Sequence, residues 1–222
     1  AILSVVFLYW RRFLGLIPTN ASSAVNSYST LAGWPGLWRI AAASAPALLV
    51  GYLARHVIKE RLFNPEAVTL ALAVGGVAIL LVERLAVPRR SSSLDTLTLA
   101  QAFGIGLCQI LALWPGTSRA AATIVGGMLL GLDRKAAAEF SFLIAVPVLF
   151  AATGYELLKM RDQLALEDSL ALAIGFVVSF VVALIAVKGF VSYLSRGKLA
   201  PFAWYRIVVA PVFYFLTRGA RL

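Results

Sequence analysis

The sequence predicts an all-α, polytopic integral membrane protein that contains a broken helix pair. Of its 222 residues, 61% are hydrophobic, and the mean hydropathy is +0.88. A soluble domain of this length would be far more polar. Several uncharged stretches are long enough, or nearly long enough, to cross the hydrocarbon core of a bilayer. We therefore treat residues 1–222 as one membrane domain, with the bilayer as a partner.

Charge and cysteine content narrow the function classes. The formal net charge is +10, and the basic residues lie in short groups between apolar stretches. This pattern fits cytoplasmic loops and anionic lipid headgroups, and no hydrophilic domain is present to bind nucleic acid. Cys108 is the single cysteine, so an internal disulfide is excluded and the thiol is expected to pack among apolar neighbours. No Cys and His cluster predicts a zinc site, and no metal ligands are assigned within this sequence.

Apolar stretches bounded by proline, glycine and polar clusters predict the helices in order. A helical tail over Ala1–Trp10 continues to Ile17, and its uncharged part is too short to span a bilayer. Because this tail begins in mid-helix, we expect the protein to continue before Ala1. The longer helices are predicted over Ile40–Ala54, Ala67–Val82, Ala136–Leu158, Ser169–Val187 and Phe202–Thr217. Polar loops are predicted over Thr19–Thr30, Pro88–Ser93 and Lys159–Asp168.

Two charged positions outside the broken pair have more than one interpretation. His56, the single histidine, lies in the basic segment Arg55–Arg61 and is either catalytic or, as we favour, interfacial. Arg206 follows two aromatic residues and either reaches a phosphate or, as we favour, anchors its helix at the membrane interface. The distribution of basic loops along the sequence does not settle which side of the membrane is cytoplasmic.

The chain is organised around the broken pair. Its first arm is predicted over Thr96–Trp114 and its second over Arg119–Gly131. Pro115 and Gly116 end the first arm, because proline removes a backbone donor and glycine permits a turn. The second arm is too short to span alone. Residues 96–131 are therefore predicted to form a re-entrant hairpin that is buried in protein or lines a wet cavity.

The break combines the residue types that bind phosphate. Thr117 and Ser118 can cap the second arm, whose first turn offers unpaired N–H groups and the positive end of a helix dipole. Arg119 adds a forked, permanently charged donor, which is costly in a bilayer unless it binds something. Thr123 lies one turn later on the same face. The alternative is a kinked spanning helix in which the hydroxyls bond to backbone and Arg119 snorkels; we favour the anion site.

Two features beyond the break bear on how the site is supported. Gly127 and Gly131 are four residues apart, which predicts the close approach of another helix. Glu139 either pairs with Lys135, four residues earlier, or faces the cavity and orients Arg119. Both interpretations of Glu139 stay open at this point.

One set of residues is specific enough to indicate a family. It comprises Gln109, Leu113-Trp-Pro-Gly-Thr-Ser-Arg119, Thr123, the glycines at 126, 127 and 131, and Glu139-Phe-Ser-Phe142. This set resembles the second signature of the undecaprenyl-diphosphate phosphatases, which are bacterial bacitracin-resistance membrane enzymes. The similarity extends to Leu62-Phe-Asn-Pro65 and to Tyr205-Arg206, and it covers essentially the whole chain.

The resemblance implies a fold of inverted repeats, each contributing a re-entrant helix pair to a shared cavity. It implies hydrolysis of undecaprenyl diphosphate to the monophosphate lipid carrier of cell-wall synthesis. The expected cofactor is a divalent metal, Mg²⁺ or Ca²⁺. The site is expected to open to the outer face of the bacterial plasma membrane, and a homodimer is a further expectation.

The resemblance also assigns roles by motif. Arg119 would hold the diphosphate and, together with Ser118, is a candidate catalytic residue. Gly116 would let the backbone approach the phosphate. The candidate substrate-binding residues are Gly116, Thr117, Ser118, Arg119 and Thr123. The candidates for a supporting layer around them are Glu139 and Gln109.

Two departures from the family pattern matter. Ala120 stands where the family usually has a serine directly after the arginine. The acidic first signature, Glu-Gly-x-Thr-Glu-Phe-Leu-Pro-x-Ser-Ser with a following histidine, is not found in these residues, and we expect it to precede Ala1. Asp and Glu together number only 10. We therefore expect this chain to supply the substrate-binding half of the site, and the metal ligands to lie before Ala1.

A different function class stays open on these residues. A membrane transporter or flippase for a lipid phosphate also aims broken helices at an anion. Carboxylates beside Arg119 would favour hydrolysis, whereas a site exposed alternately to both faces would favour transport. A non-catalytic scaffold would instead place Arg119 at the protein surface or among lipid headgroups.

Overall fold

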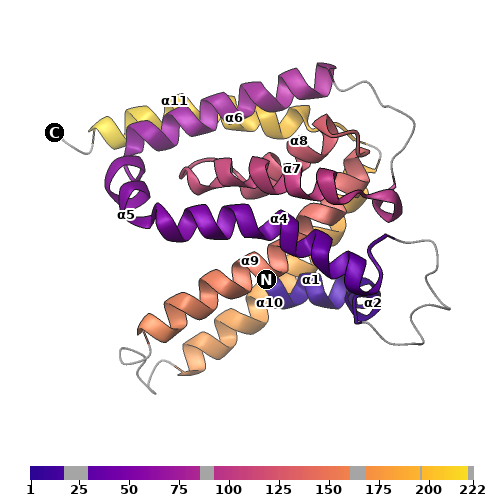
Figure 1. The fold of residues 1–222 in the computed structure, drawn as a ribbon. Coiled ribbons are helices and arrows are strands. Elements are labelled where there is room, and N and C mark those ends of the chain that lie inside the picture. Colours follow the sequence, from indigo (N-terminus) through magenta and orange to yellow (C-terminus); the bar gives the residue numbers. More distant parts are fainter. Residues whose placement is uncertain (18–29, 86–92, 161–168, 196, 220–222) are drawn as a thin grey trace.

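The computed structural model describes residues 1–17, 30–85, 93–160, 169–195 and 197–219, and every regular element in these ranges is a helix (Figure 1). The predicted loops over Thr19–Thr30, Pro88–Ser93 and Lys159–Asp168 lie almost entirely outside the described residues. The elements are α1 (Ile2–Leu8), α2 (Trp10–Gly15), α4 (Gly33–Leu53), α5 (Arg55–Val57), the π-helix η1 (Ile58–Leu62), α6 (Pro65–Leu85), the 3₁₀-helix η2 (Leu94–Thr96), α7 (Leu99–Ile110), the 3₁₀-helix η3 (Leu111–Leu113), α8 (Arg119–Leu129), α9 (Arg134–Met160), α10 (Ser169–Leu194) and α11 (Ala200–Gly219).

Within the described ranges, five helices are long and apolar enough to cross a membrane: α4, α6, α9, α10 and α11. The prediction of an all-α, multi-pass membrane protein is confirmed. These five helices are longer than predicted, whereas α7 and α8 are shorter than the two predicted arms. Helix α4 begins at Gly33 rather than Ile40, because Pro35 lies in its first turn, where proline is tolerated. Helix α10 continues past Val187 to Leu194, so the charge of Lys188 does not end it.

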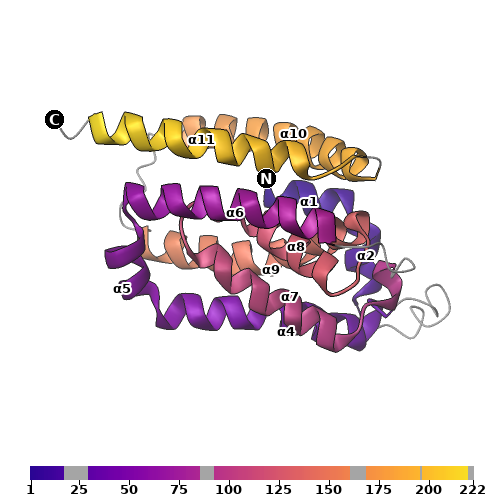
Figure 2. The same cartoon turned by 90° about the horizontal axis from the view of Figure 1, so that it is seen from above.

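The long helices run between two edges of the molecule (Figures 1 and 2). At one edge, which we call the α5 edge, α4 ends, α5 and η1 turn the chain, and α6 begins. At the opposite edge, which we call the α2 edge, α4 begins, α6 ends and α2 lies. Helix α9 begins at the α2 edge and ends at the α5 edge, while α10 returns to the α2 edge and α11 runs back.

Helices α7 and α8 form an antiparallel hairpin between the longer helices. A capping box starts α7, with Thr98 as the N-cap and Gln101 bonding back to it. The Gln101 side-chain amide also donates to Leu130 O at 2.9 Å, which joins the start of α7 to the end of α8. Farther along, a Cβ at Gly126 would lie 2.7 Å from Cys108 Cβ, so glycine permits close packing of the arms. Both outer ends of the hairpin therefore lie together, whereas its re-entry into a bilayer and the inverted repeat stay predictions.

The two glycines of the second arm have different roles. Gly127 packs against α9 as predicted, because a Cβ there would lie 2.9 Å from Ala137 Cβ. The prediction for Gly131 is wrong, since nothing lies within 4 Å of its Cβ position. Gly131 instead has φ +95° and ends α8, with Leu132 N donating to Gly127 O (2.9 Å) and Gly131 N to Met128 O (3.1 Å). This is the Schellman arrangement that glycine favours at a helix C-terminus.

One face of the hairpin contributes to the buried core of the fold, whereas α10 is largely exposed. Helix α7 packs against α4, α8 packs against α9, and α6 packs against α11. The core includes Ile105 and Ile124 of the hairpin, together with Phe140 and Ile144 of α9. None of the apolar window of α10 is buried inside the protein. A long, exposed helix that is apolar on nearly all sides is the form that lipid contact favours.

Candidate functional site

The turn between α7 and α8 is a hydrogen-bonded reverse turn held against α6. Thr117 N donates to Trp114 O at 3.0 Å, with Pro115 and Gly116 in the two central positions. Gly116 has φ +92°, close to the value of the third residue of a type II turn. The Trp114 indole donates to Ala67 O of α6 at 3.1 Å. The sequence Trp-Pro-Gly-Thr thus ends the first arm and ties its tip to a spanning helix.

Gly116 is required by the closeness of α6. A Cβ at this position would lie 2.6 Å from Val68 O and 3.2 Å from Ala71 Cβ. The close approach that the structure shows at Gly116 is therefore to a helix backbone. Approach of the same backbone to a phosphate stays a prediction.

Ser118 is the N-cap of α8, as the sequence predicts. Its hydroxyl accepts from Ala121 N at 3.2 Å, while Thr117 lies in the turn directly before it. Neither residue lines the cavity described below. The structure therefore gives Ser118 a role in starting the helix that begins with Arg119, and its catalytic role stays a prediction.

Thr123 and Arg119 both bind Ser141 of α9. The Thr123 hydroxyl donates to Arg119 O at 2.9 Å and shares a 2.6 Å hydrogen bond with the Ser141 hydroxyl, which must then be the donor. Arg119 Nη1 donates to Ser141 O at 2.8 Å. Thr123 is fully buried and does not reach the cavity. These contacts fix the first two turns of α8 on α9 and leave the Arg119 guanidinium held from one side.

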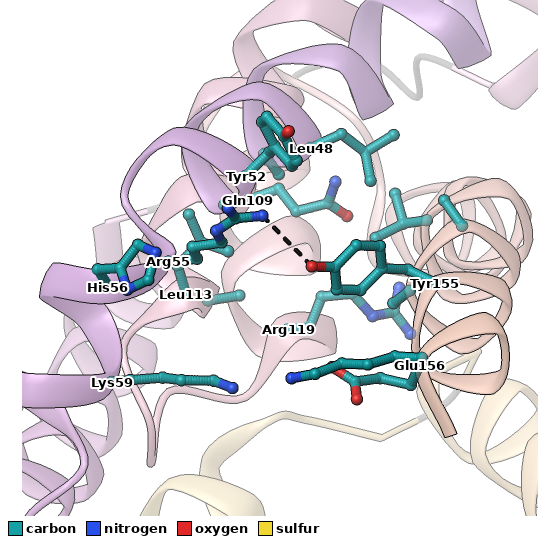
Figure 3. Close-up of a pocket in the computed structure, with 17 residues that line it drawn as sticks. Leu48, Tyr52, Arg55, His56, Lys59, Gln109, Leu113, Arg119, Tyr155 and Glu156 are labelled. Carbon is teal, nitrogen blue, oxygen red and sulfur yellow. Dashed lines mark hydrogen bonds between the residues drawn. The ribbon is translucent and has the colours of Figure 1, made fainter. Parts of the chain in front are cut away.

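Arg119 lies at a cavity of about 770 Å³ (Figure 3). One wall is a stripe of α4 that continues through α5 into η1, and the facing wall is the last part of α9, from Val148 to Lys159. Gln109 and the η3 residues Ala112 and Leu113 line it from the hairpin. The walls are mainly apolar. The cavity therefore has mainly apolar walls, contains the charged side chain of Arg119 from the hairpin, and extends toward the α5 edge.

The rim of the cavity is basic. Arg55, His56, Lys59 and Lys159 line it, and Glu156 is the one carboxylate among the lining residues. Arg55 Nη1 donates to Tyr155 Oη at 3.3 Å, which bridges the two walls, and its guanidinium lies 4.9 Å from the centre of the Tyr52 ring. In Figure 3 the labelled rim side chains and Arg119 surround the same space. This arrangement attracts an anionic group that carries an apolar tail.

Of the two candidates for a supporting layer, Gln109 lines the cavity and Glu139 does not. Gln109 is 1% exposed and lines the cavity, with its amide nitrogen 3.4 Å from Ala43 O. Its side-chain oxygen has no partner among the described residues. Glu139 lies 3.9 Å from Lys135 Nζ and does not line the cavity. The helix-surface pair is thus the interpretation of Glu139 that the structure favours, and an orienting role toward Arg119 is not seen.

The structure shows neither interpretation of Arg206. The side chain is only 7% exposed, so it does not anchor α11 at an interface, and it does not line the cavity. Arg206 Nη2 instead donates to Gly116 O at 2.9 Å and to Ala71 O at 3.1 Å. A second arginine therefore contacts the turn from α11, outside the cavity.

The described residues contain few metal-ligating side chains near the cavity. Among the parts of the chain that the structure describes, no group of three or more His, Cys, Asp or Glu residues lies close enough to hold an ion. At the cavity itself, Glu156 and His56 are the residues of these types. The described residues do not by themselves form a divalent-metal site.

Sequence reasoning missed the convergence of the rim. The sequence predicts a basic segment over Arg55–Arg61 and a polar loop over Lys159–Asp168, and it predicts no contact between them. Their meeting at one cavity depends on how α4 and α9 pack about the hairpin, which residue spacing does not report. Ser141 was noted only as part of a motif, although its carbonyl and hydroxyl both seat the second arm.

Comparison with known proteins identifies the family of this chain. Residues 1–212 match the family described as bacitracin resistance protein BacA. The chain is 51% identical over 215 residues to an undecaprenyl-diphosphatase of Solidesulfovibrio magneticus, covering 97% of this chain and 79% of that protein. Proteins of the same name from Maridesulfovibrio salexigens and Nitratidesulfovibrio vulgaris are 48% and 49% identical, with the same coverage. With a family match and relatives of this similarity along nearly its whole length, the chain belongs to the bacitracin resistance protein BacA family.

Proposed function

We propose that this protein binds undecaprenyl diphosphate with the diphosphate at Arg119 and hydrolyses it to undecaprenyl phosphate, which returns the lipid carrier to cell-wall synthesis. The observation that carries the proposal is the position of Arg119 in a mainly apolar cavity with a basic rim. A polyprenyl diphosphate has the matching form, an anionic head on a long apolar chain. Relatives that are about half identical carry the name of this activity.

Arg119 would act by binding and charge stabilisation. An arginine has five N–H donors, and among the described residues one of them is used, by Ser141 O. The others can bind phosphate oxygens in the forked geometry that suits this group. Phosphoryl transfer depends largely on positioning and on stabilising charge that develops on the phosphoryl oxygens. The bond to Ser141 holds the guanidinium in place before the substrate arrives, which is the preorganisation that makes such stabilisation effective.

The rim would gather the anionic head before Arg119 binds it. A diphosphate carries more charge than one guanidinium can balance, and Arg55, Lys59 and Lys159 lie on the path from the α5 edge. The exposed rim charges would act through solvent, so their contribution would be moderate and sensitive to salt.

The positions of the basic residues favour an outward-facing cavity. Described residues at the α2 edge are Arg11, Arg12, Arg39, Arg84, Arg134, Lys135, Lys188 and Lys198, against Arg55, Lys59, Arg61, Lys159 and Arg218 at the α5 edge. Lysine and arginine accumulate on the cytoplasmic side of membrane proteins. This supports an orientation in a bacterial plasma membrane with the α2 edge inside and the cavity opening outside.

We also propose a divalent metal cofactor and a homodimer, both of which the family resemblance implies. A divalent metal, Mg²⁺ or Ca²⁺, stays a prediction whose ligands would come from the acidic signature rather than from the described residues. A homodimer likewise stays a prediction. The transporter or flippase alternative is carried by no particular observation.

The proposal is tested by phosphate release from a polyprenyl diphosphate in detergent with Mg²⁺. The chain would be assayed alone and joined to an N-terminal segment that bears the acidic signature, each with native Arg119 and with Arg119→Ala. Arg39→Ala is the matched control, because Arg39 also donates to backbone carbonyls, Leu97 O and Pro35 O, but lies outside the cavity. Release that requires Arg119 and not Arg39 is expected. Equal release from the Arg119→Ala protein would contradict the proposal.

A further inference from the structure

Arg206 is a charged side chain enclosed between two membrane helices and the hairpin turn. It lies on α11, is 7% exposed, and donates from Nη2 to Ala71 O of α6 and to Gly116 O of the turn. Its Nε is buried and has no hydrogen-bond partner among the described residues. The guanidinium is thus the group that joins α11, α6 and the turn at one point.

Helix α6 is shaped to admit this side chain. A Cβ at Gly75 would lie 2.4 Å from Arg206 Nη2, and a Cβ at Gly76 would lie 2.9 Å from Ala203 O. Consecutive glycines in a helix interior lower its stability by about 0.5–1 kcal/mol each relative to alanine. Their place here lets α11 approach α6 and lets the arginine pass between them to the turn.

Packing alone does not explain a buried arginine. Helices α6 and α11 could pack through apolar side chains, whereas a charge with an unpaired Nε costs desolvation that its hydrogen bonds offset only in part. Of its two acceptors, Ala71 O belongs to a continuous helix, where a carbonyl already has a backbone partner. Gly116 O lies in a turn, and the Arg206 bond is the one the structure shows for it. The contact that depends on Arg206 is therefore the contact with Gly116.

The turn transmits this contact to Arg119. Gly116 is followed by Thr117, whose N–H closes the turn on Trp114 O, and by Ser118, whose hydroxyl caps α8. Arg119 is the first residue of that helix. A rotation of the Gly116 peptide would therefore change the direction in which α8 starts and the position of the Arg119 guanidinium in the cavity.

We propose that Arg206 is a positioning residue for Arg119, which fixes the Gly116 carbonyl so that α8 starts in the direction that places the guanidinium in the cavity. This rests on the proposed function of Arg119 as the diphosphate-binding residue. No substrate contact is assigned to Arg206, because it is 7% exposed and does not line the Arg119 cavity.

A double-mutant cycle tests this role. The rate constant kcat/KM for a polyprenyl diphosphate, and its binding in detergent, would be measured for the native protein, Arg206→Ala, Arg119→Ala and the double variant. All four would carry the N-terminal segment of the preceding test. Small displacements of a substrate-binding group can cost about 10²-fold, so we expect Arg206→Ala to lower kcat/KM by about that factor. In the Arg119→Ala background the same change should cost less than about threefold, because the residue it positions is gone.

Two variants and one control separate positioning from general stability. Arg206→Lys keeps the charge and a single donor nitrogen, so it should recover part of the loss. Gly75→Ala keeps Arg206 but displaces its guanidinium, so it should reproduce the loss even if Arg206→Ala does not fold. Arg39→Ala should lower the thermal midpoint without lowering kcat/KM.

The outcomes are distinguishable. Equal costs of Arg206→Ala with and without Arg119 would show an independent structural role and overturn the inference, as would native kcat/KM in both Arg206→Ala and Gly75→Ala. If the native protein neither binds nor hydrolyses the substrate, the proposed function fails instead. If the native protein is active and the effects of Arg206→Ala and Arg119→Ala are not additive, the result supports both the proposed function and the positioning role of Arg206.

Discussion

The two sides of the hairpin tip carry the same residue type in two different settings. On one side, Arg119 donates to Ser141 O and faces a cavity. On the other, Arg206 donates to Gly116 O and Ala71 O and is enclosed by α6 and α11. Both arginines stand in apolar surroundings and both bind backbone carbonyls. A buried arginine in a membrane protein is therefore not by itself evidence of a ligand site. The site is indicated by open space beside those N–H donors of the arginine that the protein does not use.

The largest expected effect concerns the fork of Arg119. Arg119→Lys keeps the charge but loses the paired, planar donors, so we expect hydrolysis of the polyprenyl diphosphate to fall by about 10²–10³-fold. The same substitution at the control position, Arg39→Lys, should leave the rate within about twofold of native, because that side chain makes only carbonyl contacts away from the cavity. Native activity in Arg119→Lys would show that a positive charge alone is enough for hydrolysis. It would then contradict the claim that the free donors of Arg119 distinguish it from Arg206.

The second prediction compares two glycines with nearly equal φ. At both positions an alanine would be strained by the positive φ of the backbone. At Gly116 its Cβ would also lie 2.6 Å from Val68 O, whereas at Gly131 nothing lies within 4 Å of the Cβ position. We expect Gly131→Ala to cost about 1–2 kcal/mol and Gly116→Ala to cost about 1–3 kcal/mol more, together with most of the activity. Unfolding of the purified proteins in detergent measures the difference. Equal losses would mean that α6 does not confine the turn.

A third change tests how the second arm is seated on α9. Thr123→Val keeps the shape but leaves the Ser141 hydroxyl without its 2.6 Å partner, at a cost of about 1–3 kcal/mol. Thr123→Ser keeps the hydroxyl and loses a methyl group, so it should stay within about 1 kcal/mol of native. If Thr123 instead contacts the phosphate, as the family resemblance implies, Thr123→Val would lower substrate affinity without changing stability.

The smallest predicted effects lie at the rim. Lys59→Ala and Lys159→Ala should each raise KM by about twofold to fivefold at low salt and leave kcat unchanged, since exposed charges act weakly through solvent. The effect should vanish as salt rises. Lys188→Ala at the α2 edge is the control and should change neither constant. A rim effect that persists at high salt would indicate direct contact with the bound head group.

Local sequence chemistry predicted much of this fold and the centre of its site. Hydropathy located the five long helices, and Pro115, Gly116, Ser118 and Arg119 located the break and the start of α8 because a turn, a cap and a charged donor are local features. The sequence did not show why two of the glycines are required, because their close neighbours are distant in the chain. Gly116 is small because Val68 lies beside it, and Gly75 is small because Arg206 passes it. Nothing in the spacing of either segment reports these neighbours.

The same limit explains the two side chains whose interpretation changed or narrowed. Arg206 next to two aromatic residues is typical of an interfacial anchor, and only the packing of α11 on α6 shows it buried against the turn. Glu139 had two plausible partners in the sequence, and the orientation of α9 decides for Lys135. In each case the residue type predicted a polar contact correctly, while its partner depended on helix packing.

The central claim is that the diphosphate binds in the Arg119 cavity, and substrate protection of a cavity residue tests it most directly. Cys108→Ala provides a background without thiols. Into it are placed Ala112→Cys, which lines the cavity, or Ser192→Cys near the α2 edge as a control. Alkylation by a small maleimide would then be timed with and without a polyprenyl diphosphate. The account predicts that the diphosphate slows alkylation at 112, leaves 192 unchanged, and loses its effect when Arg119 is replaced by alanine. Equal alkylation at 112 with and without bound diphosphate would contradict it.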